Sequence, residues 1–396
     1  MSSKKSIAYI IDELFYYDSK NNCYVSKFSA GNFLKLLQKN LDMECDFVFP
    51  VSKKPTPSSY STIFKTDDYK VEPLPGWEGV ISYYQMLLNP KVSFLLKSKV
   101  AKLINRYDIF WIRIPSPFGL RLGRAAEKQG KFVIYNVVGD IRLAHNSEKY
   151  KGLKNIFAKT AGYCFHRKSL STSKNSVFLC VGSVLYNVYK KAHKEVEFFI
   201  DSLVKSEDIK MPKVKLSNPL KILYVGKLVR SKGIYFLIDT IKELNCKYKL
   251  ELHMVGHGEE CDRVKKSAHE NKFIKFHGFV PQGAELNKIY SDCDILIMPS
   301  ILSEGFPRVI LEAWSNGLIV ISANIGGIES LGQHLKNILF FEPGNKNSLI
   351  EQIELVLHHS NVREELRKGI IDVQKVISSD YMIERVKNVL IRNSLI

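Results

Sequence analysis

The sequence predicts an α/β protein of two domains, each built on a doubly wound parallel β-sheet. The chain has 396 residues, a length that suits two domains. Short β-branched and aromatic runs alternate with stretches of helical periodicity, a pattern typical of α/β folds. The runs are continuously apolar, as expected for strands that helices cover on both faces of a parallel sheet.

Eleven apolar runs are the expected strands. In the first half of the chain we expect strands at residues 6–10, 45–50, 109–113, 132–138 and 177–180. In the second half we expect them at residues 221–225, 250–255, 274–276, 295–298, 319–322 and 338–341. Residues 53–61, rich in Pro and Ser, are expected to form a surface loop.

The domain boundary is expected within residues 205–218, a polar stretch that contains Pro212 and precedes a new strand–loop–helix unit. The first domain then comprises residues 1–212 and the second residues 213–378. Residues 379–396 have helical periodicity and are expected to form a helix that packs back on the first domain.

Ligands of doubly wound sheets bind beyond the carboxyl ends of the strands, so the binding site is expected in the loops that follow the strands. Residues 226–233, after the strand 221–225, contain Gly226, Lys227 and Lys232 and lead into a helix at 234–244. A glycine permits close backbone approach, and a helix N-terminus attracts anions. The loop therefore suits a diphosphate, although the two lysines can equally be solvated surface charges.

A second loop, residues 299–308, separates the strand 295–298 from a helix that contains Glu312. Glu304 precedes this helix, and Gly305 permits close approach of a ligand to the backbone. Ionised carboxylates only accept hydrogen bonds, which matches the hydroxyl donors of ribose and hexose. The alternative is a capping Glu304 and a surface Glu312. Residues 326–329 (Gly-Gly-Ile-Glu) and 256–258 (Gly-His-Gly) follow two further strands.

These segments resemble the retaining glycosyltransferases of family 4, which have the GT-B fold of two Rossmann-like domains facing across a cleft. The family motifs G-[RK]-x(4)-KG, G-x-G, P-S-x(3)-E-G-F-x(5)-E and G-G-x-x-E occur here in family order and spacing. Each motif alone is weak, whereas the ordered set is specific. The resemblance covers about residues 220–344.

The resemblance implies a donor-binding role for a set of residues. Lys227 and Lys232 would neutralise the donor diphosphate, Glu304 would contact the sugar hydroxyls, and Glu312 would bind the ribose. The remaining donor contacts that it implies are Gly31, Gly226, His257, Val280, Gly305, Phe306 and Pro307.

The first half matches the family less closely. Residues 28–32 are similar to the glycine loop over the diphosphate, with Gly31 followed by an expected helix at 33–41. Asp140 stands where the family has a polar residue near the reaction centre, and His145 is a weaker candidate. A capping role for Asp140 is an open alternative.

The implied reaction needs no cofactor beyond a nucleoside-diphosphate sugar as co-substrate, and we expect no metal ion. Lys227 and Lys232 would stabilise the charge that develops on the leaving diphosphate. Closure of the interdomain cleft would exclude water from the donor.

Charge is concentrated in the first half of the chain. Residues 1–218 hold 35 Lys and Arg and 19 Asp and Glu, a net charge of +16, whereas the whole chain carries +18. Residues 91–106 and 149–168 are basic and have apolar residues at helical spacing. Such helices can lie on anionic membranes or simply face the core with a solvated basic side. We expect membrane contact, with a lipid-linked or saccharide acceptor and a role in capsule or O-antigen synthesis.

The expected location is the cytoplasm, at the inner face of the membrane, since no signal segment or membrane-spanning run is visible. The seven Cys form no C-x-x-C pair, which suits reduced thiols. Two other functions stay open. One is a nucleotide-sugar epimerase with the same fold. The other is a nucleic-acid-binding protein, which the absence of an aromatic-rich RNA motif disfavours.

Overall fold

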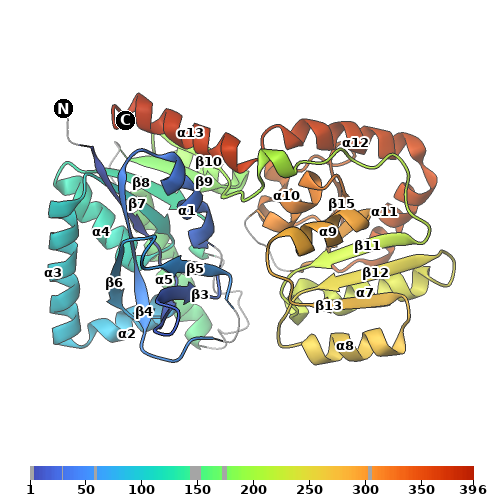
Figure 1. Ribbon diagram of the computed structural model, residues 1–396, viewed down its shortest axis with the longest axis horizontal. Coiled ribbons are helices and arrows are strands. Elements are labelled where there is room, and N and C mark those ends of the chain that lie inside the picture. The colour runs from blue at the N-terminus through green and yellow to red at the C-terminus, as the bar shows by residue number, and fades with distance from the viewer. Residues whose placement is uncertain (1–3, 29, 58–59, 143–152, 172–175, 302–305) are drawn as a thin grey trace. The chain divides into compact units, whose positions relative to one another are not determined.

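The computed structural model describes residues 4–28, 30–57, 60–142, 153–171, 176–301 and 306–396. The chain divides into two compact units (Figure 1). The first comprises Met1–Asp201 and Ile383–Ile396, and the second comprises Ser202–Met382. This division assigns residues 202–212 to the second unit, whereas the boundary expected from the sequence lay after residue 212.

The first unit contains a ten-stranded sheet in the order β10-β9-β8-β7-β1-β4-β2-β3-β5, with β6 beside β4. Its central strands are parallel, as the apolar runs predict. These strands are β1 (Ser6–Ile10), β4 (Glu44–Ser52), β6 (Val71–Pro75), β7 (Ile109–Ile114), β8 (Phe132–Val137), β9 (Val177–Val181) and β10 (Val196–Phe199).

The sequence analysis missed β6 and β10 among these strands. It also missed three further strands that form an extension of the sheet with antiparallel pairs. They are β2 (Phe15–Asp18), β3 (Cys23–Ser26) and β5 (Thr62–Lys65). The strand β2 pairs with Val51 and Ser52, at the carboxyl end of β4. Buried Phe15, Phe49 and Phe64 pack against one another there and hold the extension on the parallel sheet.

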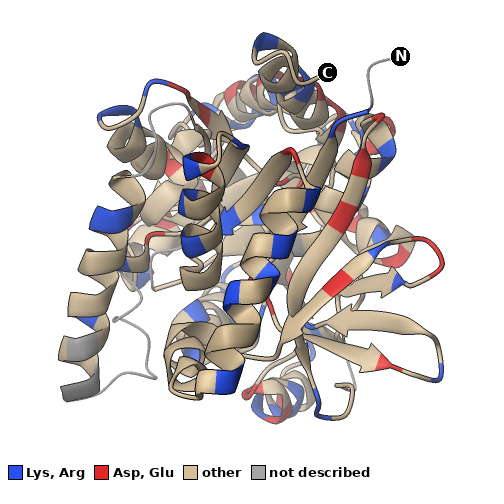
Figure 2. Cartoon of the chain, turned by 90° about the vertical axis from the view of Figure 1, so that its left-hand side faces the viewer, with Lys and Arg blue, Asp and Glu red and all other residues tan. Residues whose placement is uncertain are grey.

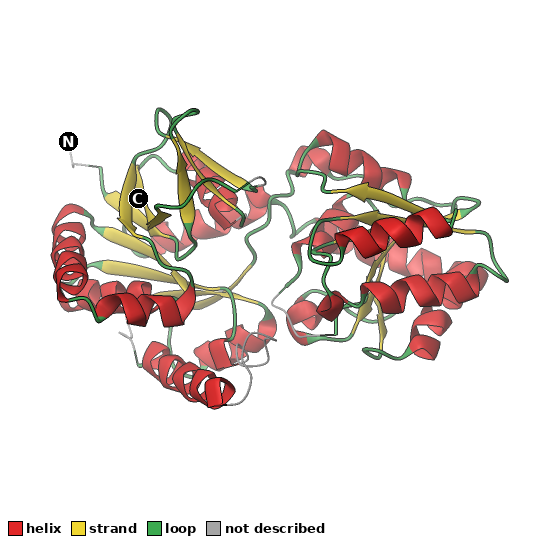
Figure 3. Cartoon of the chain, turned by 90° about the horizontal axis from the view of Figure 1, so that it is seen from below, coloured by secondary structure: helices red, strands yellow, loops and turns green. Residues whose placement is uncertain are grey.

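Helices cover this sheet (Figure 3). They are α1 (Ala30–Asn40), α2 (Gly79–Leu87), α3 (Pro90–Arg106), α4 (Pro117–Lys128), α5 (Leu153–Leu170) and α6 (Ser183–Lys190). The helix α1 begins three residues earlier than expected, so part of the expected loop 28–32 is its first turn. The last helix, α13 (Ser379–Arg392), starts in the second unit and ends in the first.

The end of α13 packs into the first unit. Its residues Val386, Val389 and Leu390 are buried. Arg385 and Arg392 donate to Glu197 of β10 at 2.5 and 2.9 Å. The side chain of Lys5 also reaches the carbonyl oxygen of Ser394, at 2.8 Å. The C-terminal residues are therefore an integral part of this unit.

The second unit contains a six-stranded, fully parallel sheet in the order β13-β12-β11-β14-β15-β16. The strands are β11 (Leu220–Val225), β12 (Leu250–Val255), β13 (Ile274–Gly278), β14 (Ile295–Met298), β15 (Ile319–Ala323) and β16 (Leu339–Phe341). Counted from β11, this is the strand order 3-2-1-4-5-6 of dinucleotide-binding folds. All six strands were predicted, and most of them are largely buried apolar runs.

The helices of the second unit connect these strands and cover both faces of the sheet (Figure 3). They are α7 (Ile234–Leu244), α8 (Cys261–Glu270), α9 (Ala284–Asp292), α10 (Arg308–Ser315), α11 (Lys346–His358) and α12 (Ser360–Gln374). Short 3-10 turns occur at η2 (Ser206–Asp208), η3 (Arg230–Lys232) and η4 (Gly326–Ser330). Both units therefore have the doubly wound α/β architecture that the sequence predicts.

Candidate functional site

The strand order of the second unit defines where a ligand should bind. The strands β11 and β14 are hydrogen-bonded neighbours, and the chain leaves them in opposite directions along the sheet. Such a switch point opens a crevice at the carboxyl edge of a parallel sheet. The two loops that leave these strands, residues 226–233 and 299–307, are the ones that the sequence analysis selected.

The two loops touch through their backbones. Gly233 has a φ of +69° and is the N-cap of α7. A Cβ atom at this position would lie 2.0 Å from the carbonyl oxygen of Pro299. The amide of Ile301 donates to the carbonyl oxygen of Ser231 at 3.0 Å. Only glycine fits at position 233, because the conformation and the neighbouring carbonyl both exclude a side chain.

The loop after β12 joins the same cluster. A Cβ atom on Gly256 would lie 1.9 Å from the carbonyl oxygen of Gly226, and one on Gly258 would lie 2.3 Å from that of Leu228. The amide of Leu228 donates to the carbonyl oxygen of His257 at 3.0 Å. The side chain of His257 itself is exposed. The glycines of the Gly-His-Gly segment thus serve loop packing.

The cations of the first loop differ in their surroundings. Lys227 is exposed, and its carbonyl oxygen accepts a hydrogen bond from Tyr224 at 3.0 Å. Lys232 is partly buried in the turn before Gly233. Arg230, which was not selected from the sequence, pairs with Glu260 at 2.9 Å. Lys227 and Lys232 lie in the loop that precedes the N-terminus of α7, a combination of charges and helix dipole that attracts anions.

Glu312 is a recessed, partly buried carboxylate on α10. Its Oε2 atom accepts a hydrogen bond of 2.8 Å from the hydroxyl of Tyr290, which is fully buried on α9. Burial raises the pKa of Glu312, while the hydrogen bond from Tyr290 opposes that rise. Tyr290 therefore orients Glu312, a role for which the sequence offered no signal beyond its place on the apolar face of a helix.

Three other predicted donor contacts are described in the second unit. Phe306 is 6% exposed, and its ring centroid lies 6.1 Å from that of Trp314. Pro307 is the N-cap of α10 and carries no amide proton. Val280 follows β13 and is 8% exposed. Phe306 and Pro307 thus fix the start of the helix that carries Glu312.

Three predicted site residues, Glu304, Gly305 and His145, lie outside the described residues.

Two predicted site residues belong to the first unit. Gly31 lies inside α1, where a Cβ atom would be 2.8 Å from the Phe64 ring and 2.9 Å from Thr62. The structure thus gives Gly31 a packing role against β5. Asp140 follows β8, and Arg142 donates to both of its carboxylate oxygens, at 2.9 and 3.1 Å from Nε. Burial raises the pKa of Asp140, but the hydrogen bonds from Arg142 outweigh burial and hold it below its ordinary value.

One metal-like sequence was overlooked, namely Asp292-Cys293-Asp294, an Asp-x-Asp arrangement. The structure places Asp294 just before β14, at the edge of the sheet opposite the glycine loops. Asp294 accepts from Lys213 at 3.3 Å, from Ser217 at 3.0 Å and from the amide of Lys221 at 2.9 Å. Its acceptor positions are thus occupied by protein donors. Among the described residues, no cluster of His, Cys, Asp and Glu suits a metal ion.

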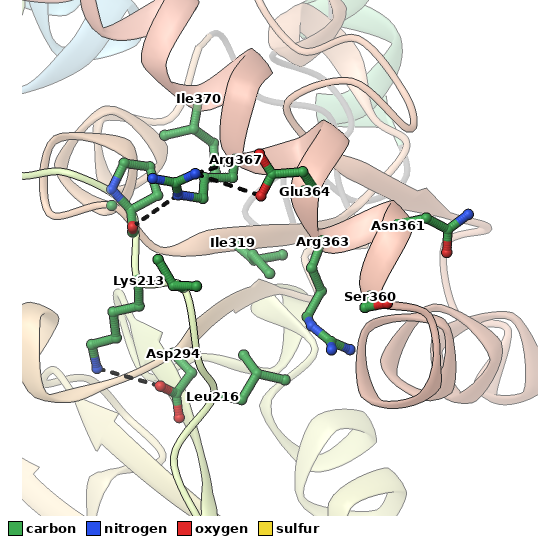
Figure 4. A pocket seen from close by; sticks show the side chains of 13 residues that line it. Lys213, Leu216, Asp294, Ile319, Ser360, Asn361, Arg363, Glu364, Arg367 and Ile370 are labelled. Atoms are coloured by element: carbon green, nitrogen blue, oxygen red, sulfur yellow. Dashed lines mark hydrogen bonds and ion pairs between the residues drawn. The ribbon is translucent and has the colours of Figure 1, made fainter.

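Asp294 also lines a cavity of about 400 Å³ (Figure 4). The segment from Pro212 to Leu216 forms one wall and α12 forms another. Arg367 donates to the carbonyl oxygen of Pro212 at 3.4 Å and pairs with Glu364 at 3.4 Å. Lys213 pairs with Asp294 at 3.3 Å, and Arg363 donates to the carbonyl oxygen of Val356 at 2.7 Å. These contacts hold the segment 212–216 and α12 in place.

Comparison with known proteins assigns much of the second unit. Residues 205–372 match the family model described as "Glycosyl transferases group 1". The second unit is thus similar to group 1 glycosyltransferases over most of its length. The glycine loops, Lys227, Lys232 and Glu312 all lie inside it.

Several curated proteins are similar to the chain. An uncharacterized glycosyltransferase of Haemophilus influenzae is 29% identical over 180 residues, which are 44% of this chain and 50% of that protein. Protein CapJ of Staphylococcus aureus is 28% identical over 289 residues, 72% of this chain and 70% of CapJ. The putative teichuronic acid biosynthesis glycosyltransferase TuaC of Bacillus subtilis is 31% identical over 151 residues, 38% of this chain and 36% of TuaC. The match thus spans about half the length of the first of these relatives.

Solved structures share the fold of the whole chain. HepE of Anabaena in complex with UDP has a TM-score of 0.68 and 15% identity, and the match covers 97% of this chain and 99% of HepE. Sucrose-phosphate synthase of Thermosynechococcus elongatus has a TM-score of 0.69 and 16% identity, with 98% and 99% covered. The chain has the GT-B fold, which confirms the fold that the motifs implied.

Proposed function

We propose that the chain is a retaining glycosyltransferase that moves a sugar from a nucleoside-diphosphate sugar to a saccharide acceptor. The observation that carries this proposal is the backbone contact at Gly233. It joins the lysine-bearing loop 226–233 to the loop that leads to Glu312, at the switch point of the sheet. A donor with an anionic diphosphate and neutral hydroxyl groups matches these two loops.

The roles of the residues follow from their chemistry. Lys227, Lys232 and the N-terminus of α7 bind the diphosphate and stabilise the negative charge that grows on it as the sugar leaves. Glu312, held by Tyr290, accepts hydrogen bonds from the ribose. Glu304 would accept hydrogen bonds from the sugar. Lysines can supply this stabilisation without a metal ion, so we propose a metal-independent transfer.

The relatives suggest the class of substrates. HepE has been solved with UDP, and TuaC carries the description of a teichuronic acid biosynthesis glycosyltransferase. We therefore propose a uridine-diphosphate sugar as the first donor to test, and a lipid-linked saccharide of a cell-surface polysaccharide as the acceptor. Asp140 and Arg142 of the first unit are proposed to act on the acceptor side.

Membrane contact through the basic first unit is part of the proposal. No described helix is long and apolar enough to cross a bilayer. The helices α3, α4 and α5 carry five, three and four Lys and Arg residues respectively (Figure 2). Some of these charges are structural, since Lys99 and Arg106 pair with Glu72 at 3.0 and 2.8 Å. The others provide attraction to anionic lipid headgroups.

The test is UDP binding by the purified full-length chain, followed by transfer assays with UDP-sugars. We expect Lys232→Ala and Glu312→Ala to weaken UDP binding at least about tenfold, because each removes a charged hydrogen-bonding partner worth roughly 1.5–3 kcal/mol. Lys242→Ala and Glu351→Ala, at exposed positions on α7 and α11, serve as matched controls and should bind UDP normally.

Full UDP affinity in both Lys232→Ala and Glu312→Ala, with folding intact, would remove the proposed donor site. The anomeric configuration of the product, read by NMR, tests retention. Turnover of the donor without any acceptor would instead indicate an epimerase.

A further inference from the structure

A groove in the first unit lies between three helices and has a volume of about 710 Å³. Each helix contributes residues at the spacing i, i+3, i+4 and i+7, so each presents one continuous stripe to the groove. The stripes are Val80, Tyr83, Tyr84 and Leu87 of α2; Pro117, Leu120, Arg121, Arg124, Ala125 and Lys128 of α4; and Ala161, Cys164, Phe165 and Lys168 of α5.

The lining has two chemical parts. The stripes of α2 and α5 are mostly apolar or aromatic, and Tyr83 and Phe165 are 2% and 8% exposed. Arg121, Arg124, Lys128 and Lys168 supply four positive charges. None of these four has a carboxylate partner within the described parts of the chain. Such a lining matches a molecule that is apolar at one end and anionic at the other.

The helices around the groove carry little negative charge of their own. Glu127 is the one acidic residue in the sequences of α2, α3, α4 and α5. Its carboxylate accepts a hydrogen bond from Ser176. Tyr83 lines the groove, and burial raises the pKa of its hydroxyl while the neighbouring Arg121 opposes that rise. The groove thus combines an apolar lining with cations that no carboxylate neutralises among the described residues, and an anionic headgroup can pair with these cations.

Large apolar side chains are exposed at residues that lie close in sequence to the groove residues of α2. Leu88 follows the lining residue Leu87 directly and is 83% exposed, and Phe94 on the next helix is 75% exposed. Lys91 and Lys97 are exposed on the same helix. Large exposed apolar residues among lysines are typical of a surface that enters a lipid interface, so this setting favours a membrane lipid over an acidic protein helix.

We propose that this groove binds one anionic phospholipid of the membrane, with an acyl chain between α2 and α5 and its phosphate on Arg121, Arg124, Lys128 and Lys168. This inference rests on the proposed membrane contact, and it is independent of the transferase activity. The proposal names a single lipid site between α2, α4 and α5, whereas diffuse attraction would act over the whole charged surface.

Cys164 supplies a direct test, because it is an exposed thiol inside the groove, whereas Cys246 is an exposed thiol in the other unit. The rate of maleimide labelling is measured at both thiols with vesicles of phosphatidylcholine, vesicles containing phosphatidylglycerol, or glycerol phosphate. We expect only phosphatidylglycerol vesicles to slow labelling at Cys164, with Cys246 unaffected. The proposal would be overturned if labelling slowed equally at both thiols or did not slow at Cys164. An acidic amphipathic peptide is tested in the same assay, and protection of Cys164 by this peptide but not by the vesicles would also overturn the proposal.

Variants separate the groove from overall charge. Arg124→Gln with Lys128→Gln is compared with Lys97→Gln and Lys102→Gln, which remove the same charge from exposed positions on α3. Diffuse attraction predicts roughly fivefold weaker vesicle binding per lost cation in both pairs. A groove site predicts that Arg124→Gln with Lys128→Gln weakens vesicle binding more than the α3 variants do. It also predicts that only this pair loses the protection of Cys164 from maleimide.

Ala125→Trp fills the groove without changing charge and should abolish the vesicle-dependent protection of Cys164. Thermal unfolding confirms that each variant is folded. Protection that persists in Ala125→Trp, or equal losses in the two charge pairs, would sink the groove site while leaving membrane contact and sugar transfer intact.

Discussion

Gly233→Ala should damage the second unit far more than an ordinary glycine substitution. At a φ of +69° an alanine is strained by roughly 1–2 kcal/mol. Its Cβ would also lie 2.0 Å from the carbonyl oxygen of Pro299, so the two loops must separate. That overpacking costs a further 1–3 kcal/mol, roughly. Losing the 3.0 Å hydrogen bond from Ile301 to Ser231 adds about 0.5–1.5 kcal/mol.

Gly344→Ala is the matched control. Gly344 lies in the same unit with a φ of +74°, and nothing lies within 4 Å of a Cβ at this position. It therefore shares the backbone strain of Gly233 and has none of the collision. Both substitutions also gain a similar small benefit, about 0.4–1 kcal/mol, from a less flexible unfolded chain.

Urea unfolding of the two variants, followed by fluorescence and circular dichroism, measures the difference. We expect Gly233→Ala to lose at least about 1.5 kcal/mol more than Gly344→Ala, as the collision and hydrogen-bond terms require. UDP affinity should fall only in Gly233→Ala, because only there do the donor loops move apart. Equal stability losses in the two variants would refute the steric reasoning, and normal UDP affinity would separate the loop contact from donor binding.

Three further predictions concern single contacts. Burial lowers the pKa values of His253 and His277, whose rings stack on β12 and β13, so the unfolded chain binds more protons below about pH 6.5. The stability of the second unit should therefore fall as the pH drops through that value. The double variant His253→Asn, His277→Asn should depend less on pH in its free energy of unfolding. An unchanged pH dependence in this variant would contradict the assignment to these two histidines. Gly31→Ala should lower stability by about 1–3 kcal/mol through the Phe64 collision, whereas Gly139→Ala, with open space around it, should not. A stable Gly31→Ala that binds UDP poorly would instead favour a donor role. Tyr290→Phe should raise the pKa of Glu312, because it removes a hydrogen bond that lowers it, and should shift the acid limb of UDP binding to higher pH in a titration.

The sequence predicted the second sheet well because most of its strands are buried on both faces, and such strands consist of continuous apolar residues. It did not predict β2, β3, β5, β6 and β10, which are short and partly exposed. In β5, buried Thr62 and Phe64 alternate with exposed Ile63 and Lys65. Four alternating residues are too few for a strand to be recognised from its apolar residues. Their pairing also joins residues far apart in the chain, which local patterns do not encode.

The candidate site shows the same limit. Glycine and charged residues at fixed spacing identified the loops around Gly233 and Glu312, because ligand-binding loops impose strict local requirements. The partners of those residues come from other elements. Tyr290 reaches Glu312 from α9, and Phe64 approaches Gly31 from β5. Arg142, two residues after Asp140, was the partner that a charge pattern in the sequence could have revealed.

The discontinuous first unit has a consequence for how the protein is made. A ribosome completes residues 202–382, and so the entire second unit, before it synthesises residues 383–396, which the first unit needs for its buried Val386, Val389 and Leu390. The first unit is therefore incomplete during the synthesis of the second unit. Premature termination near residue 382 would release a protein whose second unit is whole and whose first unit lacks its last helix turns, with Glu197 deprived of both arginines.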